Sequence, residues 1–199
     1  MQKIIKKSIQ NAMSYTEYKK LINTLVAINK STGENQSDIL LNFSKLNAKR
    51  MKRLDKTILL NKDTLLTIKE TKKDLLFLVL TESWCGDAAQ TLPIMYKISE
   101  ISPQIDFKII LRDANDDLMQ RYLTNGGKSI PKLLIIDKNT NDVLNSWGPR
   151  PSIATKMVMN FKKEHGALDA EFKKDLQIWY NKDKGISTQH DLMEIIENL

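Results

Sequence analysis

The chain has 199 residues, of which 41% are hydrophobic and 28% charged, a composition typical of a soluble globular protein with one core of ordinary size. No apolar run approaches the roughly 18 residues that a membrane-spanning helix needs, so we expect no membrane association. The formal net charge is +7, but the lysines are scattered and aromatic residues make up only 7%, which favours a solvated basic surface over nucleic-acid binding.

The cysteine content and the N-terminus indicate the compartment. A single cysteine cannot form an internal disulfide, which fits a reducing environment. The N-terminal stretch MQKIIKKSIQ is basic but contains no apolar segment of the length that a signal peptide needs. We therefore expect the protein to be cytoplasmic.

The N-terminal part predicts helices. Residues 1–13 are expected to be frayed or loosely docked, and an amphipathic helix is predicted over 15–29. Ser37 can cap a second helix over about 39–54. The expected buried face of that helix carries apolar residues at three- and four-residue spacing: Leu40, Phe43, Leu46 and Leu54.

The central part alternates between strand and helix patterns. Residues 56–60 could form a short strand, and 63–70 a helix. The apolar run LLFLVL (75–80) predicts a strand buried on both faces, followed by a helix over 87–101 and a strand over 105–111. Strand, helix and strand joined by short loops imply a parallel pair with a right-handed crossover.

The C-terminal part adds two strands and further helices. A short helix over 115–123 is predicted to end at a Gly-Gly turn, followed by a strand over 132–137 and an antiparallel strand over 143–147. Helices are then predicted at 152–164, 168–180 and 187–198, the last opened by a sequence close to a capping box.

The single cysteine, Cys85, lies between the buried strand and the helix that follows it. Free amide hydrogens and the helix dipole at such a position favour a negative charge, so we expect a modestly lowered pKa of the thiol, near 7 if the neighbouring carboxylates point to solvent. The carboxylates of Glu82 and Asp87 oppose this lowering. Asp87 could instead cap the helix, and Cys85 could simply be a small buried residue, as most lone cysteines are.

Three motifs occur in the order in which thioredoxins have them. They are Trp84-Cys85-Gly86 at a strand-to-helix turn, Pro93 inside the following helix, and Ser129-Ile130-Pro131 before a strand. The chain resembles the thioredoxin-like superfamily on these residues. The sequence ESWCGDAAQ, together with the SIP motif, resembles a bacterial branch of that superfamily with a single cysteine.

The resemblance covers about residues 56–165. It implies an α/β protein with a thioredoxin-like fold, in which helices flank a central mixed sheet. Residues 1–55 are then an N-terminal helical extension packed on this core, and residues 166–199 are additional C-terminal helices of the same globular unit.

The chain departs from thioredoxins at two positions. Thioredoxins have a second cysteine where this chain has Ala88, and a buried aspartate on the preceding strand where it has Val79. Dithiol chemistry needs the second thiol to attack the mixed disulfide and release the product. The protein is therefore not expected to be a dithiol disulfide reductase.

The resemblance also implies a site around the thiol. Cys85 would be the catalytic residue, with Trp84 and Gly86 beside it. Ile130 and Pro131, joined by a cis peptide bond, would bring a backbone segment to the thiol that can pair with an extended peptide.

Two arginines and two histidines complete the set of candidates. Arg112 and Arg150 could bind an anion, or could form structural ion pairs, which is the more common use of an arginine. His165 and His190 lack metal-ligand spacing with Cys85, and we expect neither a metal ion nor a cofactor.

Two functions remain open. The first is thiol redox chemistry through one cysteine, in which Cys85 forms a mixed disulfide with a protein or small-molecule thiol or disulfide and an external thiol resolves it. The alternative is a non-catalytic thioredoxin-fold binding or adaptor protein, and a structural subunit assembled through the amphipathic N-terminal helix is a more remote third reading. We rank redox chemistry first, but a buried thiol with a raised pKa would put the binding protein in first place.

Overall fold

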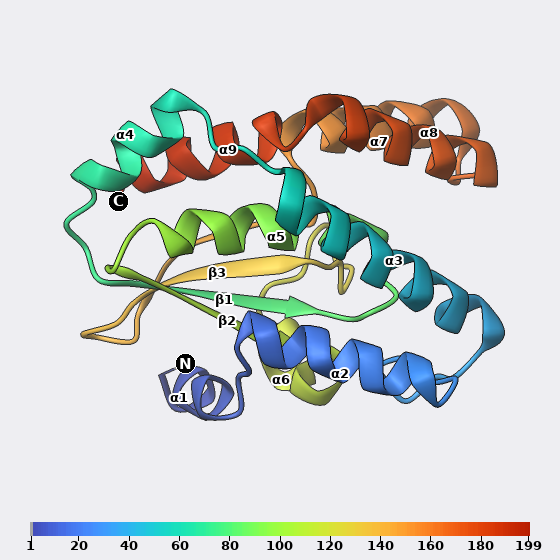
Figure 1. Cartoon of the computed structure of the whole chain (residues 1–199), viewed down its shortest axis with the longest axis horizontal. Helices are drawn as coiled ribbons and strands as arrows, with labels where there is room; N and C mark the ends of the chain where they lie inside the picture. Colours follow the sequence, from blue (N-terminus) through green and yellow to red (C-terminus); the bar gives the residue numbers. More distant parts are fainter. Residues whose placement is uncertain (1) are drawn as a thin grey trace.

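The computed structural model describes residues 2–199 and has a four-stranded mixed sheet at its centre (Figure 1). The strands are β1 (Leu75–Thr81), β2 (Ile105–Leu111), β3 (Lys132–Asp137) and β4 (Val143–Trp147). Their order is β2-β1-β3-β4, with β1 parallel to β2 and antiparallel to β3, and β3 antiparallel to β4. This confirms the parallel first pair, the antiparallel fourth strand and the thioredoxin-like α/β fold predicted from the sequence.

Helices cover both faces of the sheet. Every residue of β1 is buried, as its continuous apolar run requires. Figure 1 shows α5 (Gly86–Glu100) on one face of the sheet and α2 (Tyr15–Ala27) with α6 (Asp116–Met119) on the other. The long α3 (Asp38–Thr57) packs against α5 and α2, and so passes from one helical layer to the other.

The N-terminal segment is firmly packed, so the expectation of a loosely docked segment is wrong for residues 2–13; residue 1 lies outside the described residues. Residues Gln2–Gln10 form α1, and Ile5 within it is fully buried. Met13 pairs with Ile109 of β2 through two backbone hydrogen bonds of 2.9 and 2.8 Å. Apolar burial and added strand pairing therefore fix this segment.

The buried face of α3 differs from the apolar face that its sequence predicts. Phe43 and Leu46 are 45% and 43% exposed, whereas the buried residues are Leu41, Ser44, Asn47 and Met51. The helix is rotated toward its polar residues because Ser44 and Asn47 have hydrogen-bond partners in the loop after β1. A buried polar group with a partner competes with apolar burial for a helix face.

Two shorter predictions are also corrected. Residues 56–60 form no strand: α3 continues to Thr57, and a loop leads into α4 (Lys62–Glu70). The helix predicted over 115–123 is reduced to a 3-10 turn η1 (Asp113–Asn115) and the four residues of α6. It stops early because the amides of Arg121 and Tyr122 bond the carbonyls three residues back, which tightens the chain into a turn.

The C-terminal helices α7 (Ser152–His165), α8 (Ala170–Asp183) and α9 (Ile186–Glu197) add a small second core between α7 and α8. The prediction of a capping box at α9 is wrong, because the Asp191 side chain forms no hydrogen bond with the first backbone amides of α9. Its carboxylate accepts hydrogen bonds from the amide and hydroxyl of Ser152 at 2.7 and 2.8 Å and from Trp147 Nε1 at 3.1 Å. Asp191 thus caps α7 from a distance and joins α9 to the end of β4.

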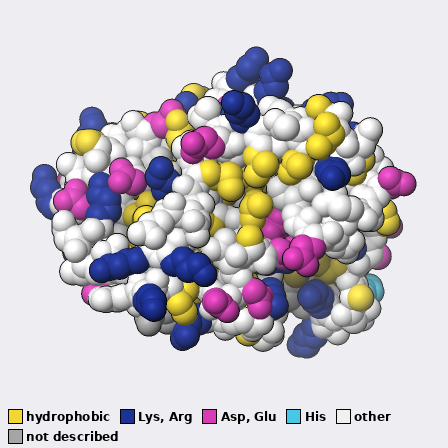
Figure 2. All heavy atoms as spheres, turned by 90° about the horizontal axis from the view of Figure 1, so that it is seen from below, with side chains coloured by type: hydrophobic (Ala, Val, Ile, Leu, Met, Phe, Trp, Pro, Cys, Tyr) yellow, Lys and Arg dark blue, Asp and Glu magenta, His cyan; other side chains and the backbone are white. Residues whose placement is uncertain are grey.

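Charged side chains of both signs share one face of the molecule. Among residues 2–199, no helix combines the length and the apolar character needed to cross a membrane. Figure 2 shows the face of α1, α2 and α6, where basic and acidic side chains are interspersed rather than gathered into a basic stripe. The scattered lysines of the sequence are therefore also scattered on this face.

We predict that Asp191→Ala lowers the free energy of unfolding by about 3 kcal/mol, because it removes a helix cap and leaves the buried Trp147 N–H without an acceptor. Urea unfolding followed by circular dichroism measures the change. Glu194→Ala, an exposed position on the same helix, is the matched control and should stay within about 0.5 kcal/mol of the wild type. Equal effects of the two substitutions would contradict the capping role.

Candidate functional site

Cys85 is held at the start of α5 by two contacts of its sulfur. It is the N-cap residue, and its Sγ accepts a hydrogen bond from the Ala88 amide at 3.4 Å. The Sγ in turn donates to the carbonyl oxygen of Ile130 at 3.2 Å. Only 8% of the residue is exposed. The cap is therefore the cysteine itself, and the expectation that Asp87 could cap this helix is wrong.

Two cis peptide bonds lie beside the thiol. The bond from Ile130 to Pro131 is cis, and so is the bond from Gly148 to Pro149. The two turns are in close contact, because a Cβ on Gly148 would lie 2.2 Å from the carbonyl oxygen of Pro131. Gly148 also has a φ of +112°, which other residues rarely adopt. Only glycine at this position lets the turn after β4 approach the turn before β3.

A buried carboxylate joins three segments next to the thiol. Asp87, 8% exposed, forms an ion pair of 2.7 Å with Arg150 and accepts a hydrogen bond of 3.0 Å from the hydroxyl of Tyr180. Gln90 donates to Gln177 of α8 at 3.0 Å. These contacts bind α8 and the turn after β4 to the first turns of α5. Arg150 therefore forms the structural ion pair that was the commoner of its two expected uses.

Gly86 lies between side chains of α3 and α8. A Cβ there would lie 3.4 Å from Gln177 Nε2 and 3.7 Å from a guanidinium nitrogen of Arg50. Side chains of α3 and α8 thus close in from two sides on the first residue of α5.

Burial, and after it the neighbouring Asp87 charge, raise the pKa of Cys85 to about 12. The hydrogen bonds from the backbone amides of Ala88 and Asp87, and then the charge of Arg150, act in the opposite direction. The expected lowering of the thiol pKa is therefore wrong. The helix-start amides are present, but desolvation of the sulfur outweighs them.

Asp87 is itself strongly affected by burial, which raises the pKa of its carboxyl. Arg150, Tyr180 and Arg50 lower it. The carboxylate thus depends on these partners to remain charged.

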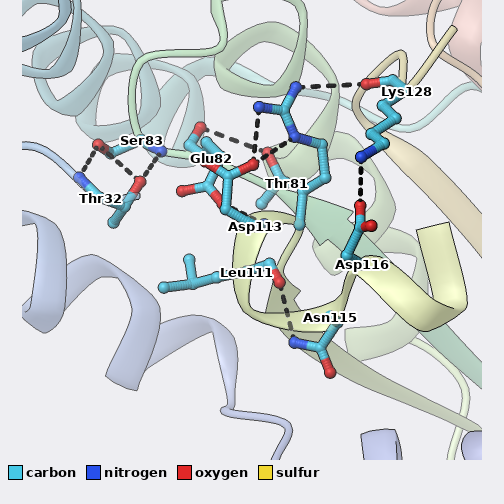
Figure 3. Close-up of polar contacts among 10 residues, drawn as sticks. Thr32, Thr81, Glu82, Ser83, Leu111, Asp113, Asn115, Asp116 and Lys128 are labelled. Carbon is cyan, nitrogen blue, oxygen red and sulfur yellow. Dashed lines mark hydrogen bonds and ion pairs between the residues drawn. The ribbon is translucent and has the colours of Figure 1, made fainter. Parts of the chain in front are cut away.

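The side chain of Glu82 contacts the start of η1. Its side chain is fully buried, and its Oε1 accepts a hydrogen bond of 3.0 Å from the amide of Asp113 (Figure 3). Burial raises the pKa of Glu82, while the Asp113 amide lowers it. Its Oε2 has no hydrogen-bond partner among the described residues. The predicted effect of this carboxylate on Cys85 stays a prediction, since its side-chain contact is with the start of η1.

Arg112 and Lys128 lie on the open side of the site. The Arg112 guanidinium forms an ion pair of 2.8 Å with Asp113, donates to the carbonyl of Lys128 at 3.3 Å, and lies 4.9 Å from the centre of the Trp84 ring. Lys128 reaches Asp116 at 2.6 Å, as Figure 3 shows. Trp84 is therefore a wall of the site that also carries a cation on its face.

A hydroxyl cluster fixes the loop that precedes Cys85. The Ser83 hydroxyl lies 2.7 Å from that of Ser44 and accepts a hydrogen bond of 3.0 Å from the Thr32 amide. The Ser83 carbonyl accepts from Asn47 at 2.9 Å. The sequence analysis missed this cluster, because serine and threonine have no recognisable spacing when their partners are tens of residues away.

A shallow cavity of about 320 Å³ opens onto the thiol. Its lining residues, called here the thiol groove, are Trp84, Cys85, Gly86, Asp87, Arg112, Lys128, Ser129, Ile130, Pro149 and Arg150. The structure thus brings together the residues predicted for the site, apart from Glu82 and Pro131. The sequence analysis missed Lys128 in the groove and Tyr180 behind it, and Lys128 could have been found from its position just before the SIP motif.

We predict that alkylation of Cys85 by iodoacetamide accelerates about tenfold per pH unit from about pH 7 to pH 10 without a plateau, because the thiolate is the nucleophile and its fraction rises tenfold per unit below the pKa. Asp87→Asn removes a neighbouring negative charge, so its pH profile should shift to lower pH. Asp63→Asn, an exposed position, is the control. A plateau below about pH 9 in the wild type would contradict the raised pKa.

Comparisons with known proteins agree with this fold. A family model described as thioredoxin matches residues 33–165. A crystal structure of a protein of unknown function from Pseudomonas aeruginosa has a TM-score of 0.58 at 20% identity, over 94% of this chain and 98% of that one. A crystal structure of an HIV epitope scaffold has a TM-score of 0.56, also at 20% identity, over 94% and 99%. A search of curated proteins gives no match. On the family match, supported by the sheet order, the chain belongs to the thioredoxin family.

Proposed function

We propose that the protein is a non-catalytic thioredoxin-fold binding protein, whose thiol groove holds an extended acidic segment of a partner protein. The observation that carries the proposal is that the Cys85 thiol is buried and protonated. Its sulfur donates a hydrogen bond to the carbonyl of Ile130, and burial raises its pKa to about 12. A thiol in this state serves as a hydrogen-bond donor that fixes the backbone before Pro131.

The chemistry of disulfide exchange supports the same conclusion. The attacking species is the thiolate, and at neutral pH a thiol with such a pKa is almost entirely protonated. Ala88 supplies no second thiol to resolve a mixed disulfide. A thioredoxin cycle needs an attacking thiolate and a resolving thiol; in this chain the first is scarce and the second is missing.

The lining of the groove supports the acidic character of the partner. Three cations, Arg112, Lys128 and Arg150, face the groove with a single carboxylate, Asp87, among its lining residues. The Trp84 ring gives a flat apolar surface beside them. Each of these cations already has a carboxylate partner, so Asp or Glu side chains of a partner segment would bind by sharing or replacing these ion pairs.

The backbone of Ile130 supplies the pairing for an extended segment. Its carbonyl accepts from Cys85, and within residues 2–199 its amide donates no hydrogen bond. A partner carbonyl can therefore pair with this amide, as in the addition of a strand to an exposed edge.

A second function, thiol redox chemistry through one cysteine, is favoured by one observation. The groove opens on Cys85, so a small disulfide can reach the sulfur. In that case the Cys85 thiolate would attack a small disulfide such as glutathione disulfide and release one thiol, and an external thiol would resolve the mixed disulfide that remains. The raised pKa places this function second.

We predict that a fluorescent peptide with alternating glutamates binds the wild type, and that Arg112→Gln or Lys128→Gln weakens the binding about three- to tenfold, because each removes one cation of the groove. Fluorescence anisotropy measures the affinity. Cys85→Ser should bind about as well as the wild type, because a serine hydroxyl can donate to the same carbonyl. Lys56→Gln is the distant control. Loss of binding in Cys85→Ser would favour the redox function.

We also predict that glutathione disulfide at about pH 7.4 leaves most of the wild type unmodified by mass spectrometry, and that the protein does not accelerate insulin reduction by dithiothreitol, because the thiolate is scarce and no resolving thiol is present. Ala88→Cys should gain some reductase activity, limited by Val79 and Asp87. Rapid and complete glutathionylation of Cys85 would reverse the order of the two functions.

A further inference from the structure

A second cavity lies away from the thiol groove, between the end of α3 and the junction of α8 and α9. Its volume is about 520 Å³, within the range of small-molecule sites. Its apolar lining includes Leu54, Ile58, Leu60 and Ile186, together with the ring of Tyr180. We refer to it as the α3–α9 cavity.

The walls of this cavity are fixed without a ligand. Gln189 of α9 is fully buried and clamps the loop after α3, accepting from the Asn61 amide at 2.9 Å and donating to the Leu59 carbonyl at 3.2 Å. Arg53 donates to Asn181 at 2.7 Å across the other side. A ligand would therefore enter a prearranged site and would lose little free energy in ordering it.

The charge of the lining is one-sided. Arg53 and Lys184 are its charged members, and no Asp or Glu lines the cavity. Neither cation forms an ion pair within the described part of the chain. The three cations of the thiol groove, in contrast, each have a carboxylate partner. The α3–α9 cavity thus offers two uncompensated cations next to an apolar interior.

The rim carries exposed apolar side chains. Leu59 is 82% exposed and Ile186 56% exposed, although both line the cavity. If an apolar chain entered the α3–α9 cavity, these side chains would be removed from water, which lowers the free energy of the complex. A ligand that satisfies both features has an apolar tail and an anionic head.

We propose that the α3–α9 cavity binds a single-chain fatty carboxylate, with its tail among Leu54, Ile58 and Leu60 and its carboxylate bonded to Arg53 and Lys184. This site is independent of the thiol groove and of the function proposed for it. The bidentate geometry of an arginine and a carboxylate makes Arg53 the main contact of the head group.

The test is titration of the full chain with decanoate by isothermal calorimetry. We expect saturable binding of one molecule per chain, weakened about tenfold or more in Arg53→Gln, because a hydrogen bond between charged groups is lost. Lys184→Gln should weaken it to a smaller extent, and Lys182→Gln, two residues earlier at the end of α8, is the matched control. Decanol, which has the same tail without the charge, should bind at least about tenfold more weakly for the same reason.

Substitution of Leu59 separates charge from shape. Its side chain is mostly exposed, so Leu59→Glu and Leu59→Lys should both fold, and circular dichroism can verify this. Leu59→Glu should weaken decanoate binding about tenfold relative to Leu59→Lys, because the glutamate repels the head group.

Three results would overturn the proposal. They are the absence of saturable binding up to about 1 mM decanoate, equal binding by Arg53→Gln and the wild type, and equal binding of decanol. Sedimentation of the ligand-free protein tests another occupant: a dimer that Leu59→Glu dissociates would assign the cavity to a second copy of the chain, which also overturns it.

Discussion

The buried ion pair between Asp87 and Arg150 is the interaction on which the arrangement of the site depends. A carboxylate taken out of water costs several kcal/mol unless it is paired and hydrogen-bonded, and here Arg150 at 2.7 Å and Tyr180 at 3.0 Å supply the partners. Arg150 belongs to the turn after β4 and Tyr180 to α8, so one side chain at the second position of α5 attaches two distant segments beside the thiol. Loss of one partner would leave a buried charge, which makes the three residues a single structural unit.

The same enclosure decides the chemistry of Cys85. A rise of its pKa from 9.0 to about 12 corresponds to about 4 kcal/mol against the thiolate. A charge at a helix start gains only about 0.3–1 kcal/mol at exposed sites. Desolvation therefore outweighs the favourable position that the sequence indicates. The motif around Cys85 is that of a reactive thiol, but the helices packed on it keep the sulfur neutral, and a neutral thiol is a donor for the Ile130 carbonyl.

Local patterns predicted the sheet well and the helix faces poorly. Every residue of the run Leu75–Leu80 is apolar, so the run must be covered on both faces. Its place inside the sheet could therefore be inferred from the local sequence. The face of α3 could not, because Ser44 and Asn47 are buried only through partners in the loop after β1. The prediction of the thiol pKa failed because this pKa depends on how far the sulfur is buried, which the local sequence around Cys85 does not show. Motif order located Cys85, Ile130 and Pro131, whereas Tyr180 and the clamp of Gln189 depend on long-range packing that has no sequence signature.

The helices outside the sheet are what distinguish this chain from a bare thioredoxin sheet with its central helix, and they act on both cavities. Tyr180 belongs to both: its ring lines the α3–α9 cavity, and its hydroxyl bonds Asp87 behind the thiol groove. A ligand in one cavity changes the other only if it binds two arrangements of this residue with different affinity. Tyr180 is 4% exposed and held by Asp87, so a single arrangement satisfies both its ring and its hydroxyl. The shared residue therefore acts as a rigid wall, and the two cavities should fill independently.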